Sequence, residues 1–522
     1  MVTCWFLRHC WFLRHCWFLR RAFWDFIAFG KFFVAKPVDI PRPSGGQPRI
    51  NPQPMITAIP EVPLRNVMVC PRAQIPWDES NPRDTKFFDL QVRLYTCYSP
   101  MQPGLPRIDA DPQVALKRAY NGLRRTLLPA PELPAEYLGS PDLGSLAVRG
   151  PYACYTKRSG SATWTWDLLM LNNYEHHDGL VKIGARVLFS KDSVRRALVA
   201  YQIDCALGRV TPSDPEWDQA CKIALCAVST HLSLVRHYNW VHLAGGAQLA
   251  IATRNNLPDR HPLCRLLWPY TFGTQQSNDM VTRGQMVRGG DFETTFSFTF
   301  DGMCRLFDDT YLDYRHSVND PETDGNSRRV RGAGFDTPTQ QNLEELFDIM
   351  HRFVQEYLEI YYPRIPKGTR LIRNDAAAMA WLDELNVLLP NGVGVRRGTV
   401  TWDSFARMLA GQLYLVTVQH EILGSFMWNY QLWTHRQPAR IYDDFEPEPL
   451  DVYQRLVNAN YILNVRRRAL MHNFDYLALD RRAKAAMVQY RTDLGVLQRK
   501  MDSRPHAVWQ VSPRELKVNI NA

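Results

Sequence analysis

The chain has 522 residues, of which 45% are hydrophobic and 22% are charged, a composition typical of one very large folded domain or roughly two to four ordinary ones. The formal net charge is +10, but half of this excess lies in residues 1–36, and no zinc-finger spacing or basic stripe with interleaved aromatics occurs, so the charge does not indicate nucleic-acid binding. The eleven cysteines contain no C-x-x-C pair, which predicts reduced, mostly buried thiols and a cytoplasmic location rather than a disulfide framework.

Three units of a hexapeptide open the chain, CWFLRH, CWFLRH and CWFLRR. Three units of six residues are too short for a solenoid, so we place residues 1–36 outside the fold as an N-terminal extension. A targeting or membrane-surface element and a tail without a role are both compatible with this segment. Residues 37–84 are rich in proline and predict an extended linker or arm, and residues 85–522 are predicted to form a single folded domain.

The hydrophobic pattern predicts a mainly α-helical domain with a few short strands. The candidate strands or buried extended segments come first, and two of them could also begin helices: 87–98, 164–174 and 179–189. Beyond residue 190 the apolar residues recur at helical spacing, and we predict these helices: 213–253, 342–363, 375–389, 404–428 and 452–464.

The segment 404–428 is apolar on nearly every helical face and is long enough to span a membrane. Its five polar side chains would be too costly in hydrocarbon: Arg407, Gln412, Gln419, His420 and Glu421. The pattern therefore predicts a central, fully buried helix of a soluble domain. A His-Glu pair buried at its middle needs a partner, because an unsatisfied polar group is costly in a core.

Two further histidines, His237 and His242, are spaced H-x4-H in the 213–253 segment. At about 100° per residue they would point roughly 140° apart on a regular α-helix and could not share a ligand. A π-bulge inserts one residue into a turn and would bring both onto one face. Taken alone, the spacing is a weak motif and favours two unrelated histidines, one bound to a backbone carbonyl and the other solvated.

His420 favours a shared site, because it lies midway along the most buried helix. The sequence HEILG at 420–424 resembles the zinc-protease H-E-x-x-H motif, but Gly424 replaces the second histidine, so that chemistry is excluded. Paired Glu-x-x-His helices, which a di-iron bundle needs, do not occur. We therefore predict one metal held by His237, His242 and His420, with iron preferred over manganese or zinc.

Several segments resemble the catalytic domain of the lipoxygenase family in the same order along the chain. The resemblance is carried by HLSLVRHYNWVHLAGGAQLAIATRNNLPDRHPLCRLLWPY (231–270), EYLEIYY (356–362), RNDAAAMAWLDEL (373–385) and LYLVTVQHEILG (413–424). It is collinear from about residue 140 to 470 and implies a non-haem iron at His237, His242 and His420. The main-chain carboxylate of Ala522 is implied as a further, anionic ligand.

The resemblance also implies an activity and its partners. A lipoxygenase-like dioxygenase inserts O2 into a polyunsaturated fatty acid: an Fe(III)-hydroxide abstracts a hydrogen from the doubly allylic carbon, O2 adds to the radical and a hydroperoxide forms. Fatty acid, or a similar apolar substrate, and O2 are thus the expected partners in an oxylipin-type lipid metabolism. We expect a monomer that binds no nucleic acid and could make transient contact with a membrane.

The chain departs from the family pattern at several positions. Gly424 stands where the family usually has Asn, and Met427 stands where a glutamine is expected. The chain ends at Ala522 rather than isoleucine, with Ile520 two residues earlier. Residues 37–140 also carry too few strand signals for the family's N-terminal β-barrel. Two alternatives therefore stay open: the same fold and metal with another reaction, such as hydroperoxide rearrangement or oxidation of another apolar metabolite, or a non-catalytic helical protein.

Three other polar residues near these motifs have roles that the sequence leaves open. Glu421 could hold a ligand histidine or pair with an arginine such as Arg407 or Arg440. His231 precedes His237 by six residues and is expected to be structural, and His261, which comes before a proline, is expected to lie in a loop.

Overall fold

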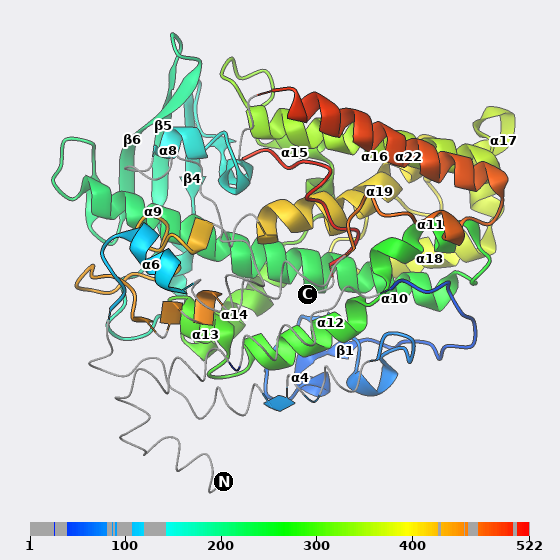
Figure 1. Cartoon of the computed structure of the whole chain (residues 1–522), viewed down its shortest axis with the longest axis horizontal. Helices are drawn as coiled ribbons and strands as arrows, with labels where there is room; N and C mark the ends of the chain where they lie inside the picture. The colour runs from blue at the N-terminus through cyan, green and yellow to red at the C-terminus, as the bar shows by residue number, and fades with distance from the viewer. Residues whose placement is uncertain are drawn as a thin grey trace, which may run out of the picture.

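A long helical run through the middle of the molecule organises the fold. In this computed structural model, α9 (Trp217–His231), the π-helical segment η5 (Leu232–Gly246) and α10 (Ala247–Asn256) follow one another without a break and cross the molecule from side to side (Figure 1). The structure describes the following residues: 26, 39–80, 86, 89–90, 107–119, 142–425, 430–450, 452–453, 455–457, 468–504 and 509–520. The run confirms the helix predicted over 213–253, and nearly all of its side chains between residues 220 and 253 are buried.

A second buried run lies against the first. It consists of α19 (Trp402–Tyr414) and the π-helical segments η8 (Leu415–Gln419) and η9 (Glu421–Ser425). A reciprocal capping box between Thr401 and Ser404 fixes its start. Gly245 allows η8 to approach η5, because a Cβ at this position would lie 2.4 Å from Leu415 Cδ2. The prediction of a central, buried helix over 404–428 is confirmed for residues 404–425.

Other helices cover this pair. α16 (Pro338–Tyr361) packs along α19 and beside α22 (Arg481–Asp502), and α17 (Arg364–Asn374) and α18 (Ala376–Leu388) close one end of the molecule (Figure 1). The run is also covered by α12 (Thr274–Val281), α13 (Asp291–Thr295) and α14 (Phe300–Tyr311). α11 (Pro262–Thr271) packs on α10 and contacts α16, where the Tyr357 hydroxyl donates to the Pro262 carbonyl at 3.0 Å. The helices predicted over 342–363 and 375–389 are confirmed as α16 and α18. Among the described residues, no helix is both long and apolar enough to cross a bilayer.

A five-stranded antiparallel sheet stands at the end of the molecule opposite α17 (Figure 1). Its strands are adjacent in sequence order: β3 (Lys157–Arg158), β4 (Thr163–Asp167), β5 (Arg186–Asp192), β6 (Ala197–Cys205) and β7 (Gly208–Val210). β4 and β5 each overlap one of the segments predicted as strands or helix starts, 164–174 and 179–189. The expectation that the chain is helical from residue 190 onward is wrong for β6 and β7. Leu198 and Ala200 point inward at a spacing of two, and a short alternating run of this kind is a strand signal.

Residues 39–80, predicted as part of a linker or arm, are packed against the helices. This segment forms β1 (Gln53–Pro54), α4 (Met55–Ala58), β2 (Met68–Val69) and η1 (Arg72–Gln74), and Met55, Val62 and Leu64 are fully buried. The Arg254 guanidinium on α10 pairs with Glu79 at 2.6 Å inside the protein. The apolar residues between the prolines thus attach this segment to the helices. The domain boundaries given in the sequence analysis stay predictions.

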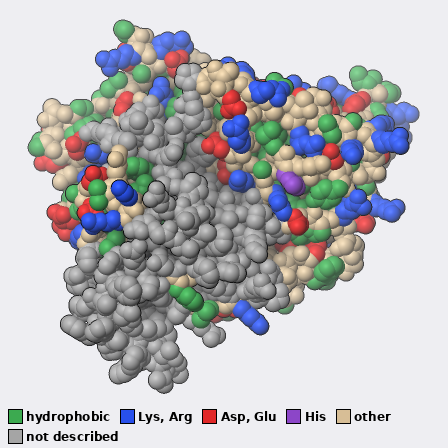
Figure 2. Space-filling view, in the orientation of Figure 1, with side chains coloured by type: hydrophobic (Ala, Val, Ile, Leu, Met, Phe, Trp, Pro, Cys, Tyr) green, Lys and Arg blue, Asp and Glu red, His purple; other side chains and the backbone are tan. Residues whose placement is uncertain are grey.

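Some sequence-based predictions fall outside the described residues. They are the extension 1–36 (except Phe26), most of the candidate strand 87–98, most of the helix predicted over 452–464, and Met427 and Ala522. On the face shown in Figure 2, Lys and Arg side chains are interspersed with acidic and apolar ones.

Candidate metal centre

Three buried histidines converge at the contact between the two central runs. His237 and His242 lie on η5, and His420 lies between η8 and η9. Their exposed fractions are 5%, 1% and 0%. The Nε2 atom of His237 lies 3.2 Å from those of His242 and His420, and the latter two are 2.9 Å apart. Among the described residues, this is the one group of three or more His, Cys, Asp or Glu side chains placed to hold a metal.

The π-helical form of η5 produces this convergence, as the H-x4-H spacing predicted. A π-helix is bonded from residue i to i+5, so side chains five positions apart lie one above the other. The imidazole rings of His237 and His242 are accordingly 4.8 Å apart between centroids. The π-helical segment extends over 15 residues, much longer than the single-turn bulge expected.

The spacing of the three nitrogens fits a metal with open coordination positions. Imidazole nitrogens bind first-row metals at about 2.0–2.1 Å, so ligands at right angles lie about 2.9 Å apart and tetrahedral ligands about 3.4 Å apart. The observed separations, 2.9 Å for one pair and 3.2 Å for the other two, fall within the range that these two geometries span. Three ligands on one face leave further positions for an anion, water or substrate, as in non-haem iron sites.

Neighbouring side chains set the tautomers of two of the histidines. The amide nitrogen of Asn278 donates to the backbone carbonyl of His242 at 3.0 Å, so its amide oxygen faces His242 Nδ1 at 3.2 Å and accepts a proton from it. A Glu421 carboxylate oxygen lies 3.4 Å from His420 Nδ1 and accepts from it in the same way. Both rings therefore direct an Nε2 lone pair toward the shared centre, an arrangement that a cation stabilises.

The contact of Glu421 with His420 agrees with the first of the two alternatives that the sequence left open, a partner for a candidate ligand histidine. Arg407, one of the two arginines considered as its partner, bonds instead to Asp320 and Glu322, and Arg440 lies 3.7 Å from Glu448. Asn278 was not predicted from the sequence. Asn278 lies on α12, whose sequence TQQSNDMV is mostly polar although its side chains are buried. Buried polar side chains need specific partners, so the burial of this helix is what marks Asn278 as a residue with a role.

The space beside Gly424 is filled by the His237 ring. A Cβ built at Gly424 would lie 2.5 Å from His237 Nε2, far inside van der Waals contact. The sequence analysis noted that glycine replaces the family's usual asparagine at this position. In the structure, a side chain at position 424 could be accommodated only if the His237 ring moved, so the glycine makes room for this histidine.

The C-terminal segment 509–520 enters the core next to η5. Ile520 is fully buried, and a Cβ at Gly246 would lie 2.5 Å from its Cδ1 atom, so glycine is needed for this approach. The amide nitrogen of Asn519 donates to the carbonyl of Phe272 at 3.3 Å. Because Ala522 lies outside the described residues, its carboxylate as a metal ligand stays a prediction.

Comparison with known proteins finds lipoxygenases both by sequence and by structure. No protein-family model matches the chain. The polyunsaturated fatty acid lipoxygenase ALOX15 of Mus musculus is 25% identical over 319 residues, which are 56% of this chain and 47% of the relative, so the match spans about half of that relative's length. A calcium-dependent 11R-lipoxygenase structure superimposes with a TM-score of 0.71 at 16% identity, covering 89% of this chain and 78% of that one.

A second similar structure is that of a manganese lipoxygenase. The manganese lipoxygenase of Gaeumannomyces graminis superimposes with a TM-score of 0.68 at 14% identity, covering 91% of this chain and 96% of that one. Identities this low establish the fold rather than the reaction. With the converging histidines of η5 and η9, the comparisons lead to one conclusion: the chain contains a lipoxygenase-like catalytic domain.

Proposed function

We propose that the protein is a non-haem metal dioxygenase that inserts O2 into a polyunsaturated fatty acid and forms a hydroperoxide. The observation that carries the proposal is the convergence of three buried Nε2 atoms at 2.9–3.2 Å from one another. The name of the mouse relative supports the substrate class, and the lipoxygenase-like fold supports the reaction class. Iron is the preferred metal, and the manganese lipoxygenase among the structural neighbours makes manganese the second choice.

In this proposal the protein holds the metal and keeps water away from it. His237, His242 and His420 bind the metal, and the carboxylate of Ala522 supplies an anionic ligand. The bound metal supplies the one-electron steps that remove and return a hydrogen. The net reaction adds both atoms of O2 to the substrate: one C–H bond breaks, a C–O bond forms, and the hydrogen ends on the terminal oxygen, so no external reductant is consumed.

The surroundings of the histidines suit an apolar substrate. Tyr238 packs 5.3 Å from the His242 ring, and Phe292 packs edge-on against Tyr238 at 5.0 Å between ring centroids. Phe307 stacks on Phe292. This aromatic cluster lowers the local polarity next to the metal ligands, which favours a hydrocarbon chain over a polar substrate.

One observation supports a second reaction on the same metal. Gly424 lies beside the His237 ring, at the position where the family usually has an asparagine. Because glycine has no side chain that could bind the metal, the ligand set differs from the family pattern. A changed ligand set shifts the redox potential of a metal. The second candidate is therefore rearrangement of a fatty-acid hydroperoxide, or oxidation of another apolar metabolite.

Metal analysis coupled to oxygen uptake tests the proposal. We expect about one iron or manganese per chain and, with linoleate, O2 consumption that matches the rise of conjugated-diene absorbance. A metal-loaded protein that consumes hydroperoxide but no O2 would favour the second candidate. Protein without stoichiometric metal after purification and reconstitution would contradict both. The matched control is His231→Ala, which removes a buried imidazole from the same helical run and should leave the metal in place.

A further inference from the structure

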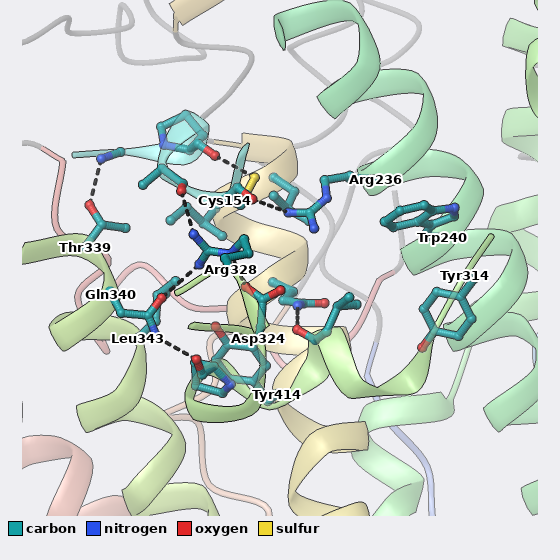
Figure 3. Close-up of a pocket in the computed structure, with 18 residues that line it drawn as sticks. Cys154, Arg236, Trp240, Tyr314, Asp324, Arg328, Thr339, Gln340, Leu343 and Tyr414 are labelled. Carbon is teal, nitrogen blue, oxygen red and sulfur yellow. Dashed lines mark hydrogen bonds and ion pairs between the residues drawn. The ribbon is translucent and has the colours of Figure 1, made fainter. Parts of the chain in front are cut away.

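A cavity is lined by residues of the same helical segments that carry the three histidines, and Figure 3 shows its lining side chains. Its empty volume, mouth included, is about 630 Å³. Arg236 and Trp240 line it from η5, and Gln419, Ile422 and Leu423 line it from η8 and η9. None of the three metal-centre histidines lines it. The cavity is therefore separate from the space toward which their Nε2 atoms point.

One cation in this cavity has few partners. The Arg236 guanidinium has five N–H donors, and its hydrogen-bond contacts among the described residues are with Cys154, through the backbone carbonyl at a long 3.5 Å and through the thiol. Asp324 lies near enough to act on Arg236 through its charge, but its carboxylate forms an ion pair with Arg328. The rings of Tyr155 and Trp240 lie 5.3 and 5.5 Å from the guanidinium carbon and hold it in place by cation–π contacts.

The second arginine of the cavity, Arg328, is in contrast fully engaged. Its guanidinium bonds to the Asp324 carboxylate at 2.8 Å, to the carbonyls of Ala153 and Thr156, and to Gln340 at 3.0 Å (Figure 3). Asp324 is thereby neutralised, and the ionised groups that line the cavity carry a net charge of +1, which comes from Arg236.

Part of the cavity wall is aliphatic. Val318, Leu343, Ile422 and Leu423 contribute aliphatic surface. We propose that this cavity binds a small apolar carboxylic acid, with its carboxylate on Arg236 and its hydrocarbon chain along the aliphatic wall. A planar guanidinium fork matches a carboxylate through two parallel hydrogen bonds, and the aliphatic wall favours an organic acid over an inorganic anion.

Such a ligand would contact both segments that hold the metal. Arg236 directly precedes His237, and Ile422 and Leu423 lie between His420 and Gly424. A ligand in the cavity would therefore restrict the motion of Arg236, Ile422 and Leu423, which are neighbours in the chain of His237 and His420. The inference goes beyond the proposed function, because it assigns an effector site that none of the metal ligands forms.

Calorimetric titration of the metal-loaded protein with hexanoate tests the site, with hexanol and hexylammonium as probes of equal chain length. We expect saturable binding of hexanoate and at least about tenfold weaker binding of both controls, because a charge-assisted bidentate pair is lost. Arg236→Met should weaken hexanoate binding about tenfold or more, and Arg236→Lys should weaken it less. The control Arg209→Met removes an exposed arginine of the sheet and should change nothing.

A second variant keeps the test independent of Arg236 and of the adjacent ligand His237. Leu343→Phe, on α16, fills the apolar part of the cavity and should weaken hexanoate binding without loss of metal. Metal content and thermal unfolding are measured for every variant. Equal affinity for hexanol and hexanoate, unchanged binding in Arg236→Met, or binding that disappears when the metal is removed would overturn the proposal. Dioxygenase activity is not a readout, so failure of the proposed function leaves this test intact.

Discussion

Buried imidazoles on one helical run have two different environments. His231, at the end of α9, is hydrogen-bonded to the Tyr155 hydroxyl at 2.7 Å and faces Trp240 edge-on. Burial, followed by the charge of Arg236, lowers the pKa of His231 to about 3, so it stays neutral. His237 and His242 instead converge with a third imidazole from another run. Burial alone does not make a histidine a metal ligand, because one buried imidazole has a hydroxyl partner, whereas the other three bring their Nε2 atoms together.

The largest expected effect is the loss of metal binding in variants of the three converging histidines. Alanine at His237, His242 or His420 should abolish stoichiometric metal binding, because the remaining two imidazoles form an incomplete site. His231→Ala should retain the metal and lose stability instead. Metal analysis of the purified and reconstituted variants distinguishes the two groups. A His231→Ala protein without metal would show that the two environments are not independent.

The next effect concerns the response of stability to acid. The folded pKa of His231, about 3, lies below its unfolded value of about 6.5, so its contribution is complete above pH 6.5 and is lost as the pH falls toward 3. Between pH 6.5 and 4 the loss should reach about 3 kcal/mol. His231→Asn keeps an acceptor for Tyr155 and cannot be protonated in this range. Urea unfolding at both pH values should show a smaller acid loss for this variant than for the wild type.

A smaller effect is expected when the room for a ligand ring is reduced. Gly424→Ala places a methyl group 2.5 Å from His237 Nε2, so the ring must shift and the metal affinity should fall about 10- to 100-fold. Gly495→Ala is the matched control, since the nearest side-chain atom to its new methyl is 3.6 Å away on α22. The control should retain the metal and gain about 0.5–1 kcal/mol of stability. Competition with a chelator measures both affinities, and equal values would refute the role of Gly424.

The smallest effect concerns the residue that orients His242. Asn278→Ala removes the acceptor of the Nδ1 proton, and the metal affinity should fall about tenfold because the ring loses its fixed tautomer. Asn391→Ala is the control: it removes an amide that bonds to the carbonyls of Leu312 and Tyr314, away from the metal centre. If both variants lost affinity equally, the effect of Asn278 would be one of general stability.

The sequence predicted the helical class, and it singled out the three histidines that converge in the structure, because hydrophobic periodicity and residue spacing are local signals. Their role as metal ligands stays a prediction. It predicted that a π-bulge was needed between His237 and His242, but not that η5 would be π-helical throughout. The strands β6 and β7 were missed, since their inward side chains are few and the following segment is strongly helical. Asn278 and Gly246 could not be assigned, because their roles arise from contacts with His242 and Ile520, distant in the chain.

Gly245 and Gly246 have a consequence for how the protein is made. These two adjacent positions of η5 receive Leu415 of η8 and Ile520 of the C-terminal segment, which lie 170 and 274 residues further along the chain. Closing such long loops is slow, and during synthesis on the ribosome these partners emerge late. The helix that carries the first two histidines is therefore translated long before the groups that enclose it, and it presents an apolar surface in the interval. Chaperone protection of the nascent chain should matter most between residues 246 and 520.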